Sequence, residues 1–179
     1  MLRVQCLAQP GPPGPGTRTD GEKMDTSQST APASTAYARI LVGVDGSAES
    51  VAALRHAAQV AEKFGSTVVA LSVWHFPISS TGPMVGWDPD RDAQSIVAEV
   101  SDQVFGPERP DWYSTEIRPG APAQVLVDES RSADLLVVGS RGHGGFSGLL
   151  LGSVSSQCAE HAACPVLIVH TPGDPGQLP

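Results

Sequence analysis

The sequence contains four continuous apolar runs of strand length, and each is followed by polar or glycine-rich residues. A strand with one face in water alternates apolar and polar side chains, whereas a strand buried on both faces of a parallel sheet is apolar throughout. The runs therefore predict a parallel sheet covered by helices on both faces. They occupy residues 40–44, 67–73, 135–139 and 165–170.

The segments between these runs have helical spacing. After Ser47, a residue suited to cap a helix, apolar residues recur every three or four positions from Val51 to Ala61, and Gly65 follows. Five strands alternating with four helices predict the α/β class: a single doubly wound, Rossmann-like domain with a five-stranded parallel sheet and helices on both faces. The other expected elements are helices over about 92–104, from Pro122 to about 131 and over 149–161, and a weaker strand over 113–117.

Composition divides the chain into one domain and two tails. Residues 1–35 are rich in Pro, Gly, Ser and Thr, so we expect a disordered N-terminal tail, a domain over 36–171 and a flexible C-terminal tail over 172–179. The chain has 11 Lys and Arg against 19 Asp and Glu, a formal charge of -8. The charges of the N-terminal tail cancel, so the excess belongs to the domain. It argues against a nucleic-acid or anionic-membrane partner, because both need a basic surface.

The sequence pattern predicts neither a membrane-spanning segment nor a secretory signal. No apolar run approaches the roughly 20 residues of a membrane span, and the first residues lack the apolar core of a secretory signal. We therefore expect a cytoplasmic protein. The three cysteines, Cys6, Cys158 and Cys164, are too few and too unevenly placed for a disulfide scaffold, which favours reduced thiols.

The segment after the run 135–139 carries the clearest functional signal. It is rich in glycine, and it leaves the carboxyl end of a buried strand and enters a helix, which is where open α/β sheets bind ligands. Glycines let the backbone approach a phosphate closely, and the helix N-terminus adds partial positive charge. Gly152 and Ser153 supply further amides and a hydroxyl. The segment therefore predicts a polyphosphate site that needs no Lys.

The spacing Gly139-x2-Gly142-x9-Gly152-Ser153 resembles the nucleotide-binding signature of the universal stress protein family. The resemblance covers residues 38–171. It includes 42–47 (VGVDGS) as the first strand and turn, 120–122 (GAP) as a helix start, and 164–169 (CPVLIV) as the last strand. It implies the adenine nucleotide alpha hydrolase-like form of the fold and ATP held at the carboxyl ends of the first and fourth strands.

The resemblance also implies individual contacts. Asp45 would accept hydrogen bonds from the ribose or adenine side, and Val73 would border the adenine. Mg²⁺ would be held mainly by phosphates and water, with no protein metal site. The residues implied to bind the nucleotide are Gly43, Val44, Asp45, Val73, Gly139, Arg141, Gly142, His143, Gly144, Gly152, Ser153, Val154 and Ser155.

Simpler roles compete for several of these residues. Asp45 or Ser153 could only cap a helix, and Arg141 and His143 could only solvate a loop. Acidic residues in 88–99 fit four positions of a calcium-loop template, but the position that requires glycine is Ala93, so a solvated acidic loop is the better interpretation.

At the level of function, the resemblance implies an ATP-binding stress-response protein with a regulatory or sensing role and little or no turnover. The alternatives are a slow ATPase or autophosphorylating protein, with Ser153, Ser155 or Ser156 as acceptor, and a dimeric scaffold that binds no nucleotide. ATP-activating enzymes of neighbouring groups are disfavoured because their loop motifs are missing. A homodimer is expected through the last strand, at Val166, Leu167, Ile168 and Val169.

Overall fold

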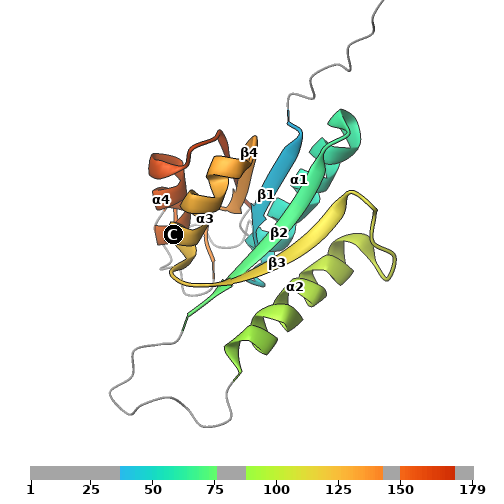
Figure 1. Ribbon diagram of the computed structural model, residues 1–179, viewed down its shortest axis with the longest axis horizontal. Helices are drawn as coiled ribbons and strands as arrows, with labels where there is room; N and C mark the ends of the chain where they lie inside the picture. The colour runs from blue at the N-terminus through green and yellow to red at the C-terminus, as the bar shows by residue number, and fades with distance from the viewer. Residues whose placement is uncertain (1–36, 76–87, 143–149, 172–179) are drawn as a thin grey trace, which may run out of the picture. The chain divides into compact units, whose positions relative to one another are not determined.

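The computed structural model describes residues 37–75, 88–142 and 150–171 (Figure 1). All of them belong to one compact unit, Ser34–Pro179. The predicted tails 1–35 and 172–179 lie outside the described residues. The strands are β1 (Arg39–Gly43), β2 (Thr67–Trp74), β3 (Tyr113–Pro119), β4 (Leu135–Gly139) and β5 (Val166–Val169). The helices are α1 (Ala48–Phe64), α2 (Pro89–Phe105), α3 (Pro122–Glu129), the 3₁₀ turn η1 (Ser130–Ser132) and α4 (Ser153–His161).

The five strands form one parallel sheet in the order β3-β2-β1-β4-β5. The chain runs from β1 outward to β3, then returns to the centre and runs outward the other way through β4 and β5. Strand order therefore reverses between β1 and β4, where Leu41 pairs with Leu136. This confirms the predicted doubly wound α/β fold, and a crevice at such a reversal is the usual ligand site of an open parallel sheet.

Two apolar cores lie on opposite faces of the sheet. Helices α1 and α2 cover one face, and α3 and α4 the other (Figure 1). Ile40 and Val42 of β1 belong to the core on the first face, whereas Leu41 between them belongs to the core on the second. All three side chains are at most 1% exposed. The apolar runs of β1, β2 and β4 are continuous because these strands are buried on both sides.

Local signals set most helix ends as expected. Ser47 caps α1, since its Oγ accepts a hydrogen bond from the Ser50 N–H at 3.1 Å, and Gly65 ends the helix in the left-handed conformation with φ 67°. Helix α2 begins at Pro89, three residues earlier than predicted, because Asp88 caps it and Pro suits a first helical position.

The predicted start of the last helix at residue 149 is wrong. Leu150 and Leu151 are not helical, and Gly152 is extended at φ -76° and ψ 169°, so α4 begins at Ser153. The Gly152 N–H donates to the Ser140 carbonyl at 2.7 Å, which fixes this segment against the end of β4.

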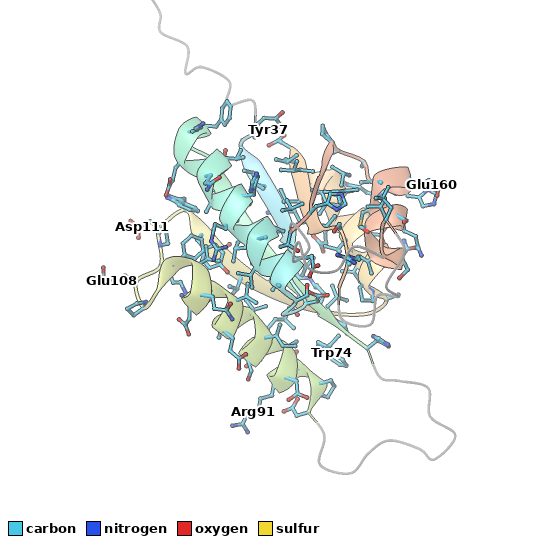
Figure 2. The ribbon with its side chains drawn as sticks, turned by 180° about the vertical axis from the view of Figure 1, so that it is seen from behind. Tyr37, Trp74, Arg91, Glu108, Asp111 and Glu160 are labelled. Atoms are coloured by element: carbon cyan, nitrogen blue, oxygen red, sulfur yellow. The ribbon has the colours of Figure 1, made fainter. Side chains whose placement is uncertain are left out.

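A side-chain hydrogen bond joins the end of β2 to the start of α2. The Trp74 indole N–H donates to Asp90 Oδ1 at 3.1 Å, and Figure 2 shows Trp74 and Arg91 at the same end of the molecule.

None of the helices in the described ranges has the length and apolar character needed to cross a bilayer. Cys158 and Cys164 are free thiols, as expected.

Candidate functional site

A cavity of about 500 Å³ opens at the carboxyl ends of β1 and β4, where the strand order reverses. Its size falls within the range of small-molecule sites. Eleven of the residues singled out in the sequence line it: Gly43, Val44, Asp45, Val73, Gly139, Arg141, Gly142, Gly152, Ser153, Val154 and Ser155. The other two, His143 and Gly144, lie outside the described residues.

One half of the cavity is apolar. Sequence reasoning missed most of its wall, because this wall forms only when α3 packs over the sheet. Pro122 was noticed as a helix start, but neither it nor the regular helical position of Leu126 carries a sign of a binding role. The missed lining residues are Leu71, Pro122, Leu126 and Val138, together with Ser50 at the start of α1.

The turn after β1 places a carboxylate at the rim of the cavity. Asp45 is exposed, and its Oδ1 accepts hydrogen bonds from the Ser47 N–H at 3.0 Å and the Ser47 hydroxyl at 2.6 Å. Gly46 between them is left-handed, with φ 86°. Asp45 therefore does not cap α1 itself but holds the capping Ser47 in place, and its second oxygen remains directed toward the loop after β4.

Two glycines allow the end of β4 to approach the β1–α1 turn closely. A Cβ atom at Gly142 would collide with Oδ2 of Asp45, and a Cβ atom at Gly139 would lie 2.7 Å from the Cβ of Glu49. Any larger residue would push the two segments apart. The glycine spacing seen in the sequence thus has a packing reason in this structure.

The first turn of α4 forms the opposite, polar wall. The N–H groups of a helix's first turn have no partner within the helix, and Ser153, Val154 and Ser155 of this turn line the cavity. Gly152 occupies the cap position, so the alternative that Ser153 merely caps the helix is wrong.

The Ser155 hydroxyl makes structural hydrogen bonds within the protein. It is buried and donates to the carbonyls of Ser140, at 2.8 Å, and Gly152, at 3.0 Å. The Ser140 N–H in turn donates to the Val169 carbonyl of β5 at 2.8 Å. Ser140 therefore joins β4, β5 and the start of α4.

Within the described part of the chain, three charged residues lie at or next to the cavity: Asp45, Glu49 and Arg141. The Arg141 guanidinium lies 3.7 Å from Oε1 of Glu49, and the same oxygen accepts a hydrogen bond from the Thr171 hydroxyl at 3.2 Å. Asp45 contributes the third charge. Among the described ranges, no group of three or more His, Cys, Asp or Glu side chains is arranged to hold a metal ion.

Comparison with known proteins finds a matching family and several relatives. Residues 36–170 match the family model described as the Universal stress protein family. The chain is 38% identical over 133 residues to a universal stress protein of Mycolicibacterium smegmatis, covering 73% of this chain and 45% of that protein. It is 32% identical over 149 residues to universal stress protein MJ0531 of Methanocaldococcus jannaschii, covering 76% of this chain and 84% of that protein. The chain thus spans about half the length of the mycobacterial relatives and most of the archaeal one.

A solved structure is similar over the same region. It is described as a universal stress protein in complex with cAMP, has 31% sequence identity and a TM-score of 0.59, and the match covers 76% of this chain and 99% of that one.

Proposed function

The chain belongs to the universal stress protein family, and from that premise we propose that it binds an adenine nucleotide, ATP with Mg²⁺, in the cavity between β1 and β4. It acts as a cytoplasmic regulatory or sensing module of a stress response, with little or no turnover.

The observation that carries the proposal is the division of the cavity into two unlike halves. Leu71, Val73, Pro122, Leu126 and Val138 offer an apolar slot suited to a flat base, and the start of α4 offers amides and a helix dipole suited to phosphate. Asp45 lines the same cavity, and its carboxylate lies against Gly142. The cavity thus combines three kinds of surface, apolar, carboxylate and amide, that suit the base, the ribose and the phosphates of a nucleotide.

The phosphates would lie against Gly139, Gly142 and the first turn of α4, with His143 and Gly144 as further proposed contacts. Asp45 is the one carboxylate among the described lining residues, so the donor set suits a Mg²⁺ ion that takes most of its ligands from phosphate and water. When bound, that ion would neutralise part of the phosphate charge.

Low turnover is supported by the chemistry of the lining. Among its described residues there is no Lys, His or Cys, and Asp45 accepts two hydrogen bonds from Ser47. If a phosphoryl group is transferred to the protein, the acceptor is Ser153 or Ser156, which are exposed, since the Ser155 hydroxyl is buried and bonded. Incubation with radiolabelled ATP measures both hydrolysis and labelling of the protein.

The direct test is to identify what the protein carries. Mass spectrometry of small molecules released from the purified, denatured chain should detect an adenine nucleotide. A thermal-shift titration with ATP, ADP, AMP and cAMP, each with Mg²⁺, should raise the melting temperature as the ligand exceeds its Kd. No released nucleotide and no shift with any of the four would overturn the proposal in favour of a scaffold.

We also propose that two copies pair through β5. This strand lies at one edge of the sheet, and its residues Val166, Leu167 and Ile168 are only partly buried within the chain. An apolar edge strand is usually covered, because its unpaired backbone groups invite another strand.

A further inference from the structure

The Glu49–Arg141 pair joins the first turn of α1 to the loop after β4, and Glu49 packs against Gly139, which lines the cavity. Arg141 lines the cavity, whereas Glu49 is not among the lining residues. Their side chains are 17% exposed for Glu49 and 38% exposed for Arg141. The guanidinium is therefore the member of the pair that borders a bound ligand.

The ion pair between Glu49 and Arg141 is weak and separates at little cost. Its 3.7 Å distance is longer than a hydrogen bond, and the 38% exposure of the Arg141 side chain lets solvent screen the attraction. When Arg141 leaves, Glu49 keeps the hydrogen bond from Thr171 and its favourable place at the positive end of the α1 dipole. Release of the guanidinium thus leaves no buried charge without a partner.

A phosphate in the cavity would compete for the same guanidinium. Arg binds phosphate through two parallel N–H donors, which is a stronger arrangement than its loose contact with Glu49. After the exchange, Glu49 still lies nearby and repels the ligand in proportion to the ligand's charge. An uncharged nucleoside experiences neither the attraction nor the repulsion.

We propose that Glu49 is a positioning residue that sets the charge selectivity of the cavity, by competing with ligand phosphate for the Arg141 guanidinium. This inference rests on the proposed nucleotide binding and deepens it. Glu49 lowers the affinity for highly charged nucleotides and leaves the affinity for the nucleoside unchanged.

The test compares one charged and one neutral ligand. Isothermal titration calorimetry on the full chain measures Kd for ATP with Mg²⁺ and for adenosine, in the wild type and in Glu49→Gln. The ratio of the adenosine Kd to the ATP Kd should rise roughly three- to tenfold in Glu49→Gln, through tighter ATP binding. Glu62→Gln is the matched control: it makes the same charge change at an exposed position near the other end of α1, and its ratio should equal that of the wild type.

Two further variants show whether the effect passes through Arg141. Thr171→Val removes the competing donor, so Glu49 should hold Arg141 more strongly and ATP affinity should fall while adenosine affinity stays constant. In an Arg141→Gln background, Glu49→Gln should lose most of its effect. Thr171→Val also provides the test if Glu49→Gln does not fold.

Three outcomes overturn the inference. They are equal changes for ATP and adenosine in Glu49→Gln, a full effect of Glu49→Gln that persists without Arg141, and an unchanged ratio in both Glu49→Gln and Thr171→Val. Each leaves the proposed function standing if the wild type binds ATP. A wild type that binds neither ligand overturns the proposed function, and the inference with it.

Discussion

At the scale of single residues, Gly142 leaves less room for a side chain than any other glycine compared in the described ranges. A Cβ atom there would meet the Asp45 carboxylate, whose other oxygen is bonded to Ser47. Asp45 cannot move away without loosening the turn that caps α1. The glycine is required by its neighbour, since its own backbone φ is not in the left-handed region.

Gly142→Ala should therefore weaken ATP binding about tenfold, corresponding to about 1.4 kcal/mol, as measured by calorimetry. Gly65→Ala is the control: Gly65 is left-handed at the end of α1, with no atom near its missing side chain. That change should cost about 1 kcal/mol of unfolding free energy and leave ATP affinity unchanged. Wild-type affinity in Gly142→Ala would show that the Asp45 contact is unimportant for binding.

Ser155 and Ser140 provide a second matched pair. Both are buried, but the Ser155 hydroxyl donates to the Ser140 carbonyl, whereas the Ser140 hydroxyl has no hydrogen-bond partner in the structure. In urea denaturation, Ser155→Ala should lower the unfolding free energy by about 1 kcal/mol, and Ser140→Ala should be neutral or slightly stabilising. Equal losses for the two variants would contradict this assignment of the hydrogen bond.

At the scale of secondary-structure elements, the strands were largely predictable and the surroundings of the cavity were not. Continuous apolar runs mark strands buried on both faces, so β1, β2, β4 and β5 were expected within one or two residues of their observed ends. The predicted start of α4 was wrong because Leu150 and Leu151 fit helical spacing. What holds Gly152 extended is the hydrogen bond from its N–H to the carbonyl of Ser140, a residue outside the local pattern.

The candidate site likewise has one half that could be predicted from the sequence and one half that could not. The glycine spacing identified its polar half, because glycine leaves a local signature in the sequence. The apolar half depends on where α3 docks, and Leu126 has the same appearance as any buried helix residue. Tertiary packing is the information that the linear pattern lacks.

The two edge strands of the sheet differ in character. β3 presents Glu116, Arg118 and Pro119, and Arg118 is ion-paired with Glu116 at 2.6 Å. β5 is apolar along its length, with the sequence VLIV. Charges and proline discourage a further strand from pairing, so β3 is protected and β5 is open.

Ile168→Pro should convert the proposed dimer into a monomer, as measured by light scattering during gel filtration. The carbonyls of Pro165 and Val169 accept from β4, so the alternate residue Ile168 directs its backbone N–H toward the open edge, and proline removes that donor without breaking the β4–β5 ladder. Thr115→Pro, an outward position of β3, is the control and should not change the mass. A dimer that persists in Ile168→Pro would exclude β5 pairing.

At the scale of the whole molecule, stability at high pH depends on a core thiol. Cys158 of α4 is fully buried in the core between this helix, α3 and the sheet, and burial raises the pKa of its thiol from 9.0 to about 11. Between these values the unfolded chain releases a proton that the folded chain keeps. The unfolding free energy is therefore intact below about pH 9 and falls as the pH rises toward 11.

Urea denaturation from pH 8 to 11 should show a loss of roughly 2 kcal/mol attributable to this group. Cys158→Ala will be less stable throughout, because it leaves a cavity, but its decline with pH should be shallower by that amount. Burial also raises the pKa of Tyr113, so some decline will remain in the variant. Identical pH slopes would rule out Cys158 as the cause.

The net charge of -8 and the charge at the cavity act over different distances. The excess of acidic residues acts over the whole surface, whereas Arg141 and the amides of α4 act within a few ångströms of a ligand. An acidic protein can therefore be unsuited to nucleic acid and still hold a nucleotide.

The difference between the two edges of the sheet also limits how far assembly can proceed. If β5 meets β5 of a second copy, both open edges are used at once, and the outer strands of the joined sheet are two copies of the charged, proline-ended β3. Such an assembly is closed by its own symmetry. In the proposed dimer, growth would stop at two copies, and the same apolar strand that could have begun a fibre would instead set a fixed stoichiometry.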